Sequence, residues 1–342
     1  MTYNPNDLIP DDESVQHFLR PVRHLMETPG VTEIAVNDPE FVFFEKQGVW
    51  QEIPVPLMNY DNCLALAIAV ASYTEQKLTA TEPIIGATLP NGERIHMVIP
   101  PVVPRNSVSL TIRIPSPETW TMEQYRDQGF YDAIRTENRG LSQGDIELMQ
   151  LYKERDFMAF LISAVKHRKN IAIVGDTGSG KTTFMKALCQ LIPLSDRIIT
   201  IEDVRELFLL KHRNKVHLTY STQGKAQIDP AALIKSTMRM KPDRVLPAEL
   251  RGAEAFDFVD LMTTGHNGSI TSFHAESSGV AFERFALMCK KHPNASSYTH
   301  SELMRLLHMT IDVIAHIDRV GNKRFISEIY FNPEKKLQLK HG

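Results

Sequence analysis

One segment of the sequence has the residue types and spacing of a phosphate-binding loop. Residues 175–182 read Gly-Asp-Thr-Gly-Ser-Gly-Lys-Thr and fit the pattern G-x-x-x-x-G-K-[ST] in full. Glycines let backbone N–H groups close around phosphates because no Cβ intervenes, and a following helix points its positive N-terminus at the anion. Lys181 is expected to reach the β- and γ-phosphates, and the Thr182 hydroxyl to bind Mg²⁺. The segment therefore predicts binding of Mg-ATP, through Gly175, Asp176, Thr177, Gly178, Ser179, Gly180, Lys181, Thr182 and Thr183.

Acidic residues at two strand ends are candidates for the hydrolytic chemistry. Glu202 and Asp203 end one predicted strand, at the edge where α/β folds place their sites; a solvated acidic turn is the alternative. The next strand ends in Val-Leu-Pro-Ala-Glu249, where a carboxylate can orient a water for attack on the γ-phosphate. Pro247 cannot donate to a sheet ladder, so this strand is expected to end or bulge there.

Histidines and arginines supply further candidates. His266 and His274 flank a short strand in Gly-His-Asn-Gly-Ser-Ile-Thr-Ser-Phe-His, with no spaced third ligand that would indicate a metal. Hydrogen-bonded structural histidines are the alternative. Arg94 and Arg113, taken singly, are surface or strand-edge arginines. Solvated positions are expected for Glu33, Glu45 and the pair Lys335–Lys336.

The elements that hold these residues divide into two blocks. The first block has a hairpin turn at residues 46–48, a helix over 57–75 and strands at 95–99 and 108–114. A polar stretch with several prolines and glycines follows. In the second block, strands and helices alternate from residue 157 to 262, which argues for a mostly parallel α/β sheet. We expect an α+β domain over 1–114, an interdomain linker over 115–151 and an ATPase domain over 152–342.

Composition excludes several other classes of protein. A chain of 342 residues suits about two domains, and a net charge of −3 gives no global indication of nucleic acid or an anionic membrane as partner. Cys63, Cys189 and Cys289 are far apart, without the spacing of a zinc site or a disulfide framework. The N-terminus has no signal-peptide pattern, and the apolar run at residues 64–71 is shorter than the roughly 20 residues of a membrane span.

Four motifs in order resemble those of the secretion ATPase superfamily. They are the Walker A loop, the Thr-Ile-Glu-Asp box at residue 200, Ala-Glu-Leu-Arg at residue 248, and the Gly-His-x-Gly-Ser…His box. Asn-Gly-Glu-Arg94, Ser-Leu-Thr-Ile-Arg113-Ile-Pro-Ser and Gln-Gly-Phe-Tyr131 are similar to the branch of small hexameric type IV secretion ATPases. The resemblance covers nearly the whole chain. It implies a RecA-like P-loop NTPase domain with a smaller α+β N-terminal domain, in a double-ring homohexamer.

The resemblance also implies roles for individual residues. Glu249 matches the Walker B glutamate, Glu202 and Asp203 the acidic box, and His266 and His274 the box that senses the γ-phosphate. Arg94 and Arg113 match arginines that reach the nucleotide from the N-terminal domain and stabilise its transition state; Arg251 matches the Walker B arginine. Two positions depart from the family pattern: Pro247 replaces an aliphatic residue and Ser272 stands where threonine is common.

The function expected from these features is an ATP-hydrolysing hexameric motor that powers a type IV secretion or conjugation machine. The cofactors are ATP and Mg²⁺, and the partners are other type IV secretion ATPases and proteins of the inner-membrane complex. The location expected is cytoplasmic and peripheral at the inner membrane, without an integral membrane segment and with nucleic acid only as cargo. Two alternatives stay open: a nucleotide-gated scaffold with little turnover, and a translocase on single-stranded nucleic acid.

Overall fold

The chain forms two compact units. The computed structural model describes residues 12–116, 118–134, 140–221 and 227–341. The first unit consists of residues 1–117, 216–229 and 239–241, and the second of residues 118–215, 230–238 and 242–342. The domain boundaries expected from the sequence stay a prediction.

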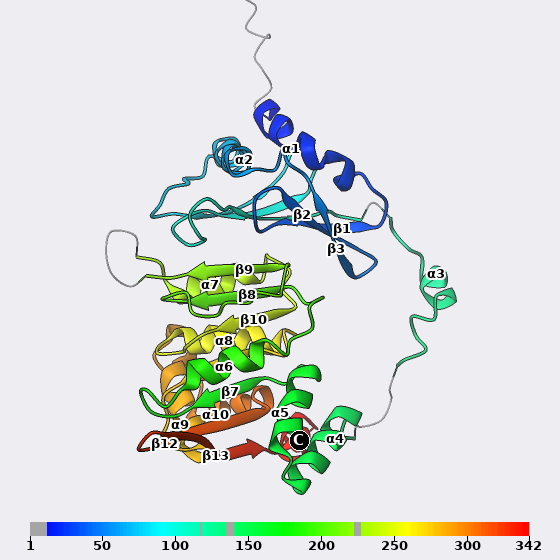
Figure 1. The fold of residues 1–342 in the computed structure, drawn as a ribbon. Coiled ribbons are helices and arrows are strands. Elements are labelled where there is room, and N and C mark those ends of the chain that lie inside the picture. The colour runs from blue at the N-terminus through cyan, green and yellow to red at the C-terminus, as the bar shows by residue number, and fades with distance from the viewer. Residues whose placement is uncertain (1–11, 117, 135–139, 222–226, 342) are drawn as a thin grey trace, which may run out of the picture. The chain divides into compact units, whose positions relative to one another are not determined.

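An antiparallel sheet forms the framework of the first unit (Figure 1). Its strand order is β3-β2-β1-β6-β5-β4. The hairpin predicted at residues 46–48 is confirmed: Gln47 and Gly48 have φ of 53° and 76°, as a two-residue type I′ turn requires. The strands are β1 (Val31–Val36), β2 (Phe41–Lys46), β3 (Val49–Pro54), β4 (Ile84–Thr88), β5 (Arg94–Val98) and β6 (Ser109–Arg113).

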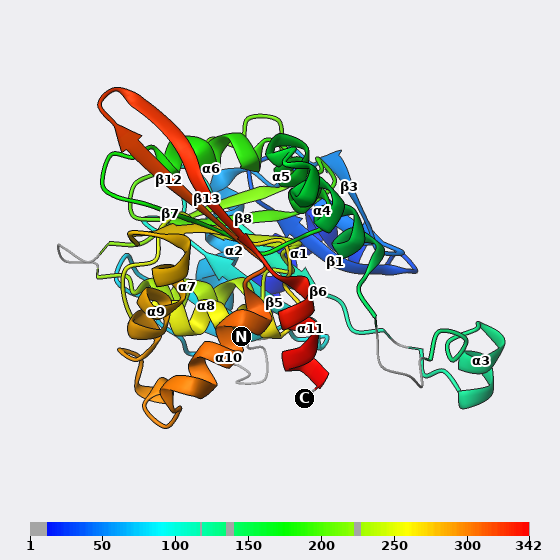
Figure 2. The same ribbon diagram turned by 90° about the horizontal axis from the view of Figure 1, so that it is seen from below.

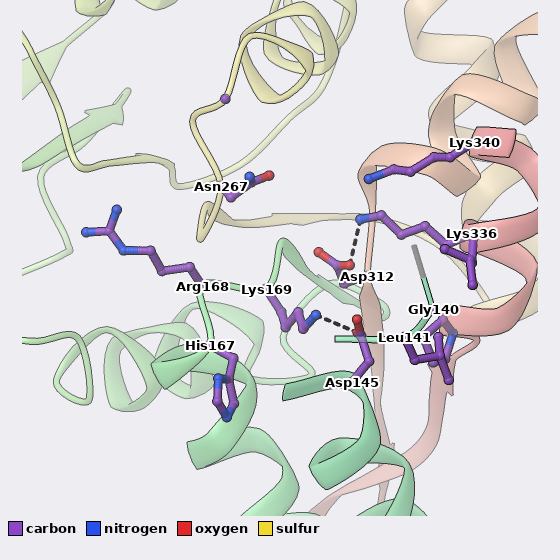
Figure 3. A pocket seen from close by; sticks show the side chains of 13 residues that line it. Gly140, Leu141, Asp145, His167, Arg168, Lys169, Asn267, Asp312, Lys336 and Lys340 are labelled. Atoms are coloured by element: carbon purple, nitrogen blue, oxygen red, sulfur yellow. Dashed lines mark hydrogen bonds and ion pairs between the residues drawn. The ribbon is translucent and has the colours of Figure 1, made fainter. Parts of the chain in front are cut away.

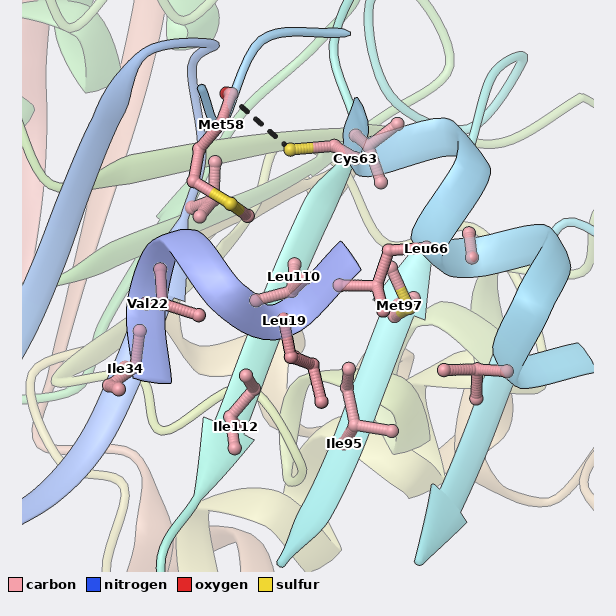
Figure 4. Packing of buried hydrophobic residues seen from close by; sticks show 14 of the residues in the cluster. Leu19, Val22, Ile34, Met58, Cys63, Leu66, Ile95, Met97, Leu110 and Ile112 are labelled. Atoms are coloured by element: carbon pink, nitrogen blue, oxygen red, sulfur yellow. Dashed lines mark hydrogen bonds between the residues drawn. The ribbon is translucent and has the colours of Figure 1, made fainter. Parts of the chain in front are cut away.

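Two helices, α1 (Glu13–Met26) and α2 (Tyr60–Tyr73), cover one face of this sheet. Figure 4 shows Leu19 of α1 and Leu66 of α2 packed over sheet residues, and both side chains are 0% exposed. The Asn59 side chain accepts a hydrogen bond from the Asn62 N–H and so caps α2. Removal of this apolar surface from water is the main force that holds helices and sheet together.

Two glutamates of this unit are buried, which makes the expectation of solvated positions wrong. Glu33 and Glu45 are 5% and 7% exposed and lie opposite each other on β1 and β2. Like charges directly opposite destabilise a strand pair. Here neighbouring groups offset that cost, because Lys241 Nζ lies 2.9 Å from Glu45 and the Thr32 hydroxyl donates to Glu45 at 3.0 Å.

Parallel strands form the framework of the second unit. Strands β11, β7 and β12 are parallel, and β13 joins β12 in antiparallel pairing. A second sheet has the order β10-β8-β9, with β10 and β8 parallel; residues 216–219 of β9 belong to the first unit. The Leu250 N–H donates to the Ser272 carbonyl of β11 at 2.9 Å, which connects the end of β10 to the first of these sheets. The predicted mostly parallel α/β organisation is confirmed.

Helices cover both faces of the parallel strands, with α5 and α6 on one side and α8, α9 and α10 on the other (Figure 2). The strands are β7 (Ile171–Val174), β8 (Ile198–Glu202), β9 (Lys215–Thr219), β10 (Arg244–Pro247), β11 (Ile270–Phe273), β12 (Val313–Val320) and β13 (Lys323–Phe331). The helices are α3 (Met122–Asp127), α4 (Gln143–Glu154), α5 (Phe157–Lys166), α6 (Lys181–Cys189), α7 (Pro230–Thr237), α8 (Glu254–Thr263), α9 (Ser278–Cys289), α10 (His300–Thr310) and α11 (Pro333–His341). Among the described residues, no helix combines the length and the apolar character that crossing a membrane requires.

Candidate functional site

The predicted phosphate-binding loop lies between the end of β7 and the start of α6. Gly175, Gly178 and Gly180 have φ of 147°, 75° and 100°, a region that glycine enters without steric cost. A Cβ at position 175 would collide with the carbonyl oxygen of Ile317 in β12. The loop therefore needs glycine both for its backbone path and for its packing on the sheet.

A cavity of about 750 Å³ opens beside this loop. Its volume falls within the range of roughly 300–1,000 Å³ that small-molecule sites occupy. The cavity brings together the loop, the end of β10, the end of β11 and the β12–β13 hairpin. Its lining consists of Thr177, Gly178, Gly180, Lys181, Thr182, Thr183, Glu206, Glu249, Arg251, Ser272, His274 and Arg324.

The Lys181 side chain is turned into its own loop. Its Nζ donates to the carbonyl oxygens of Gly175 and Asp176, both at 2.9 Å. Burial lowers the pKa of Lys181, while the charges of Glu249 and Asp176 act in the opposite direction. A phosphate oxygen in the cavity would offer a stronger, charged acceptor than these carbonyls.

His274 connects Lys181 to Glu249. Its Nδ1 lies 3.4 Å from Lys181 Nζ, and its Nε2 lies 3.1 Å from Glu249 Oε1. An ammonium group is a donor only, so Nδ1 must accept and Nε2 must carry the proton that it shares with Glu249. The three side chains thus form a continuous hydrogen-bonded chain along one wall of the cavity.

Both carboxylate oxygens of Glu249 have partners. Oε1 faces His274, and Oε2 pairs with Arg251 Nη2 at 2.7 Å. Arg251 Nη1 also pairs with Asp203 at 2.7 Å, so the predicted Asp203 acts on the cavity through this arginine and does not line it. Each oxygen keeps a second lone pair, through which Glu249 can accept a hydrogen bond from water.

Pro247 ends β10, as the sequence predicts, and costs the sheet no hydrogen bond. The N–H groups of Arg244 and Ala248 donate to β8, at the carbonyls of Arg197 (3.1 Å) and Ile201 (2.9 Å). Because alternate residues of a strand face the same neighbour, the nitrogen of Pro247 faces away from β8. The Ser272 hydroxyl donates to the Ala248 carbonyl at 2.7 Å and holds the chain just before Glu249.

Two predicted residues lie away from the cavity. Glu202 is 1% exposed, and its Oε1 accepts from the N–H groups of Glu206 and Leu207, both at 2.8 Å. This carboxylate fixes the loop after β8, and its position gives no support to a catalytic role. His266 precedes β11 whereas His274 follows it, so the two histidines lie at opposite ends of this strand. Nucleotide binding by His266 stays a prediction.

The two predicted arginines of the first unit lie side by side. Arg94 begins β5, Arg113 ends β6, and the two are direct cross-strand partners. Both side chains are exposed, and Arg113 Nε lies 3.9 Å from Glu33. Like charges directly opposite each other on neighbouring strands are unfavourable, and a bound anion offsets their repulsion.

Arg324 was missed by the sequence motifs. It comes from β13, and its Nε donates to the Gly178 carbonyl at 3.2 Å while the side chain lines the cavity. Glu206 also lines the cavity and pairs with Lys186 at 3.3 Å. Neither residue lies in a recognisable pattern, because tertiary folding alone brings the hairpin and the loop after β8 to this place.

The lining fits a magnesium nucleotide. The glycine-rich loop is a cradle without side-chain obstruction, and the Lys181 ammonium is available to exchange its carbonyl partners for phosphate. The Thr182 hydroxyl lines the same cavity at the first turn of α6, where a hydroxyl can bind the metal. Among the described residues, the buried Ser179 Oγ has no hydrogen-bond partner, which leaves a further donor in the loop.

Comparison with known proteins agrees with this site. Residues 16–317 match the family described as Type II/IV secretion system protein. The chain belongs to this family. It is 41% identical to the type IV secretion system protein VirB11 of Brucella suis, over 100% of this chain and 99% of the relative. It is 36% identical to the type IV secretion system protein PtlH of Bordetella pertussis, over 95% and 98%.

A solved structure extends the likeness to three dimensions. The crystal structure of the VirB11 ATPase of Brucella suis in complex with sulphate matches with a TM-score of 0.93, over 97% of this chain and 98% of that one, at 41% identity. The predictions of a type IV secretion ATPase and of a RecA-like α/β fold are thereby confirmed. The chain is an ATPase of this secretion family.

Proposed function

We propose that this chain is the motor subunit of a type IV secretion machine and that it hydrolyses Mg-ATP as a homohexamer. The observation that supports this most is the chain of contacts from Lys181 through His274 to Glu249 along the wall of the nucleotide-sized cavity. A loop that only binds phosphate does not need a carboxylate connected to its lysine. A hydrolase does, because one group must bind the γ-phosphate and another must orient the water.

Each residue then has a distinct task. Lys181 binds the β- and γ-phosphates once it leaves the Gly175 and Asp176 carbonyls. His274 responds to that movement, because it loses the ammonium partner of its Nδ1. Glu249 orients the attacking water, and Arg251 keeps this carboxylate in place until the nucleotide is bound. Mg²⁺, held by Thr182 and the phosphates, would neutralise developing negative charge.

Arg94 and Arg113 complete the site from the first unit in this proposal. Their cross-strand pairing supports this assignment, because one anion could bind two neighbouring guanidinium groups. We assign this nucleotide-facing role to the domain of residues 1–114, the linker role to 115–151 and the ATPase role to 152–342. The ring operates in the cytoplasm, peripheral at the inner membrane, with other type IV secretion ATPases and inner-membrane proteins as partners.

The test is steady-state Mg-ATP turnover per subunit over a wide range of protein concentration. We expect turnover to rise with concentration and then level off, because assembly completes the site. Lys181→Ala should abolish turnover, and Glu249→Gln should lower kcat by about 10²–10⁴-fold while ATP still binds. Lys291→Ala, at an exposed lysine just after α9 and outside the cavity lining, is the matched control.

Other results would change the assignment. Normal turnover by Lys181→Ala would show that ATP is not hydrolysed in this cavity. Normal turnover by Glu249→Gln would show that another residue orients the attacking water. ATP binding without turnover by the wild type at any concentration would favour the nucleotide-gated scaffold. Stimulation by single-stranded DNA, lost at high salt, would favour the translocase.

A further inference from the structure

A second cavity lies at the N-terminal ends of the parallel strands, whereas the P-loop lies at their C-terminal ends. Its volume is about 350 Å³. Lys169 precedes β7, Asn267 precedes β11 and Asp312 precedes β12, so the cavity lies where these strands begin. The P-loop and His274 follow the strands at their other ends. No residue of the nucleotide site lines this cavity.

Lysine ammonium groups from separate elements face this cavity (Figure 3). Lys169 Nζ pairs with Asp145 at 2.6 Å, and Lys336 Nζ pairs with Asp312 at 2.6 Å. Lys340 lies one helical turn after Lys336 on α11, so the two side chains share a face of that helix. The solvated position expected for Lys336 is therefore wrong, because this lysine is largely buried in an ion pair.

Both oxygens of each carboxylate in this cavity already accept from a donor of the protein. The second oxygen of Asp145 accepts from the Ser142 hydroxyl at 2.6 Å. The second oxygen of Asp312 accepts from the Asn170 N–H at 2.8 Å. Each of the two carboxylates is thus paired with a lysine, and Lys340 and Asn267 are donors outside these pairs.

These two donors have no partner within the part of the chain that the structure describes. The Lys340 ammonium makes no hydrogen bond or ion pair there, and this lysine is exposed to solvent; partial desolvation and the charge of Lys336 lower its pKa. The Asn267 side-chain oxygen accepts from Asn170 at 3.5 Å, which leaves its amide NH₂ group free. A cation beside a second cation is unfavourable, and an anion that binds between them would offset this repulsion.

We propose that this cavity binds a small oxyanion, a phosphate or carboxylate group, between Lys340 and Asn267, with Lys336 as a further donor. The bound group would tie α11 to the turn at residues 265–269. Asn170 already holds that turn, because its side-chain oxygen accepts from the N–H groups of Gly268 and Ser269 at 2.9 and 3.1 Å. The site acts at the start of β11, the strand that carries Ser272 and leads to His274. It does not depend on the proposed hydrolytic mechanism.

The test is titration of the full chain with inorganic phosphate, followed by ³¹P line broadening and by the thermal melting midpoint at constant ionic strength. The P-loop is itself expected to bind phosphate, so every protein in the series carries Lys181→Ala. We expect saturable broadening, and an upward midpoint shift of roughly 2–4 °C with phosphate about fivefold above its Kd. Parallel titration with succinate distinguishes a phosphate site from a carboxylate site by which anion saturates at lower concentration.

Matched variants locate the response. Adding Lys340→Gln should abolish the binding of the anion, and Lys340→Arg should retain it. Lys77→Gln, at an exposed lysine of the first unit, should leave the binding unchanged. Asn267→Asp keeps every lysine, adds a negative charge at the rim and should weaken binding at least tenfold, which covers the case that Lys340→Gln does not fold. Saturable binding that survives both Lys340→Gln and Asn267→Asp overturns the proposal, as does the absence of saturation by either anion.

Discussion

Arg324 contacts the middle of the P-loop, although it lies far from that loop in the sequence. Its Nε is committed to the Gly178 carbonyl, and no other hydrogen bond or ion pair of its guanidinium occurs among the described residues. The remaining N–H donors border the cavity, next to Gly180, whose added Cβ would lie 3.0 Å from Arg324 Cδ. A guanidinium in this position suits contact with the phosphates or the ribose of a bound nucleotide.

Arg324→Ala should raise the KM for ATP about tenfold and change kcat less, because a lost hydrogen bond to a charged group costs about 1.5–3 kcal/mol and exposure reduces that value. Steady-state kinetics measure both constants. Lys323→Ala, at the exposed neighbouring position of the hairpin, should leave the KM unchanged. An unaltered KM in Arg324→Ala would show that the arginine only supports the loop.

The site residues that the sequence could predict are those whose role is local. The loop spacing alone predicts that Lys181 faces the phosphate-binding loop, because strand, glycines and helix are consecutive, and its Nζ contacts the carbonyls of that loop. His266 and His274 show what a sequence motif does not predict. The four residues of β11 lie between them, and at about 3.3 Å per residue this strand holds the two histidines at its opposite ends. Glu202 ends a strand as expected, but the direction of its side chain depends on backbone N–H groups further along the loop.

At the scale of elements, a buried arginine stabilises the end of the sheet at which the parallel strands begin. Arg244 is 0% exposed, pairs with Asp196 at 2.7 Å, and donates to the carbonyls of Val165 and Gly268 at 3.0 and 3.3 Å. These contacts join β10, the end of α5 and the turn before β11. A Cβ at Gly268 would lie 2.8 Å from Arg244 Nη1, and the φ of that glycine is 89°.

Gly268→Ala should therefore destabilise the second unit by more than about 1–3 kcal/mol, since backbone strain and displacement of Arg244 act together. The urea midpoint measures the change. Gly279→Ala in α9 is the matched control, because its Cβ would meet nothing closer than 3.8 Å and its backbone is helical. We expect this control to be neutral or to stabilise by up to about 1 kcal/mol. Equal midpoints for the two variants would contradict the assignment.

Most elements before residue 274 follow from the sequence, and those after it do not. The alternation of strands and helices expected from residue 157 to 262 corresponds to the elements from α5 to α8. The edge strand β13 is mostly exposed, so it lacks the apolar alternation that would reveal it. For α10 the signal existed: Thr299 and Glu302 form a capping box, a pattern that the sequence motifs did not cover.

For the whole molecule, acid should act on both units through neutral histidines. His96 in the first unit has its pKa lowered to about 4 by burial and the charge of Arg239. His308 in the second unit has its pKa lowered to about 4 by burial and the charge of Lys335. Unfolded histidine takes up its proton near pH 6.5. Between about pH 6.5 and 4 the unfolded chain thus binds more protons, and stability falls as pH falls.

The size of this effect is bounded by one proton per histidine, about 1.4 kcal/mol per pH unit for each. Carboxylates with a lowered pKa, such as Asp145 and Glu328, begin to lose their contribution only near their unfolded pKa values of about 4, so the range from pH 6.5 to 5 reports on the histidines. The urea midpoint measured from pH 8 to 4 should be flat above pH 7 and then decline. His96→Asn and His308→Gln should each reduce the decline, while exposed His17→Gln should not. A flat profile between pH 6.5 and 5 would mean that neither histidine is held neutral by the fold, and the acid response would then begin only with the carboxylates.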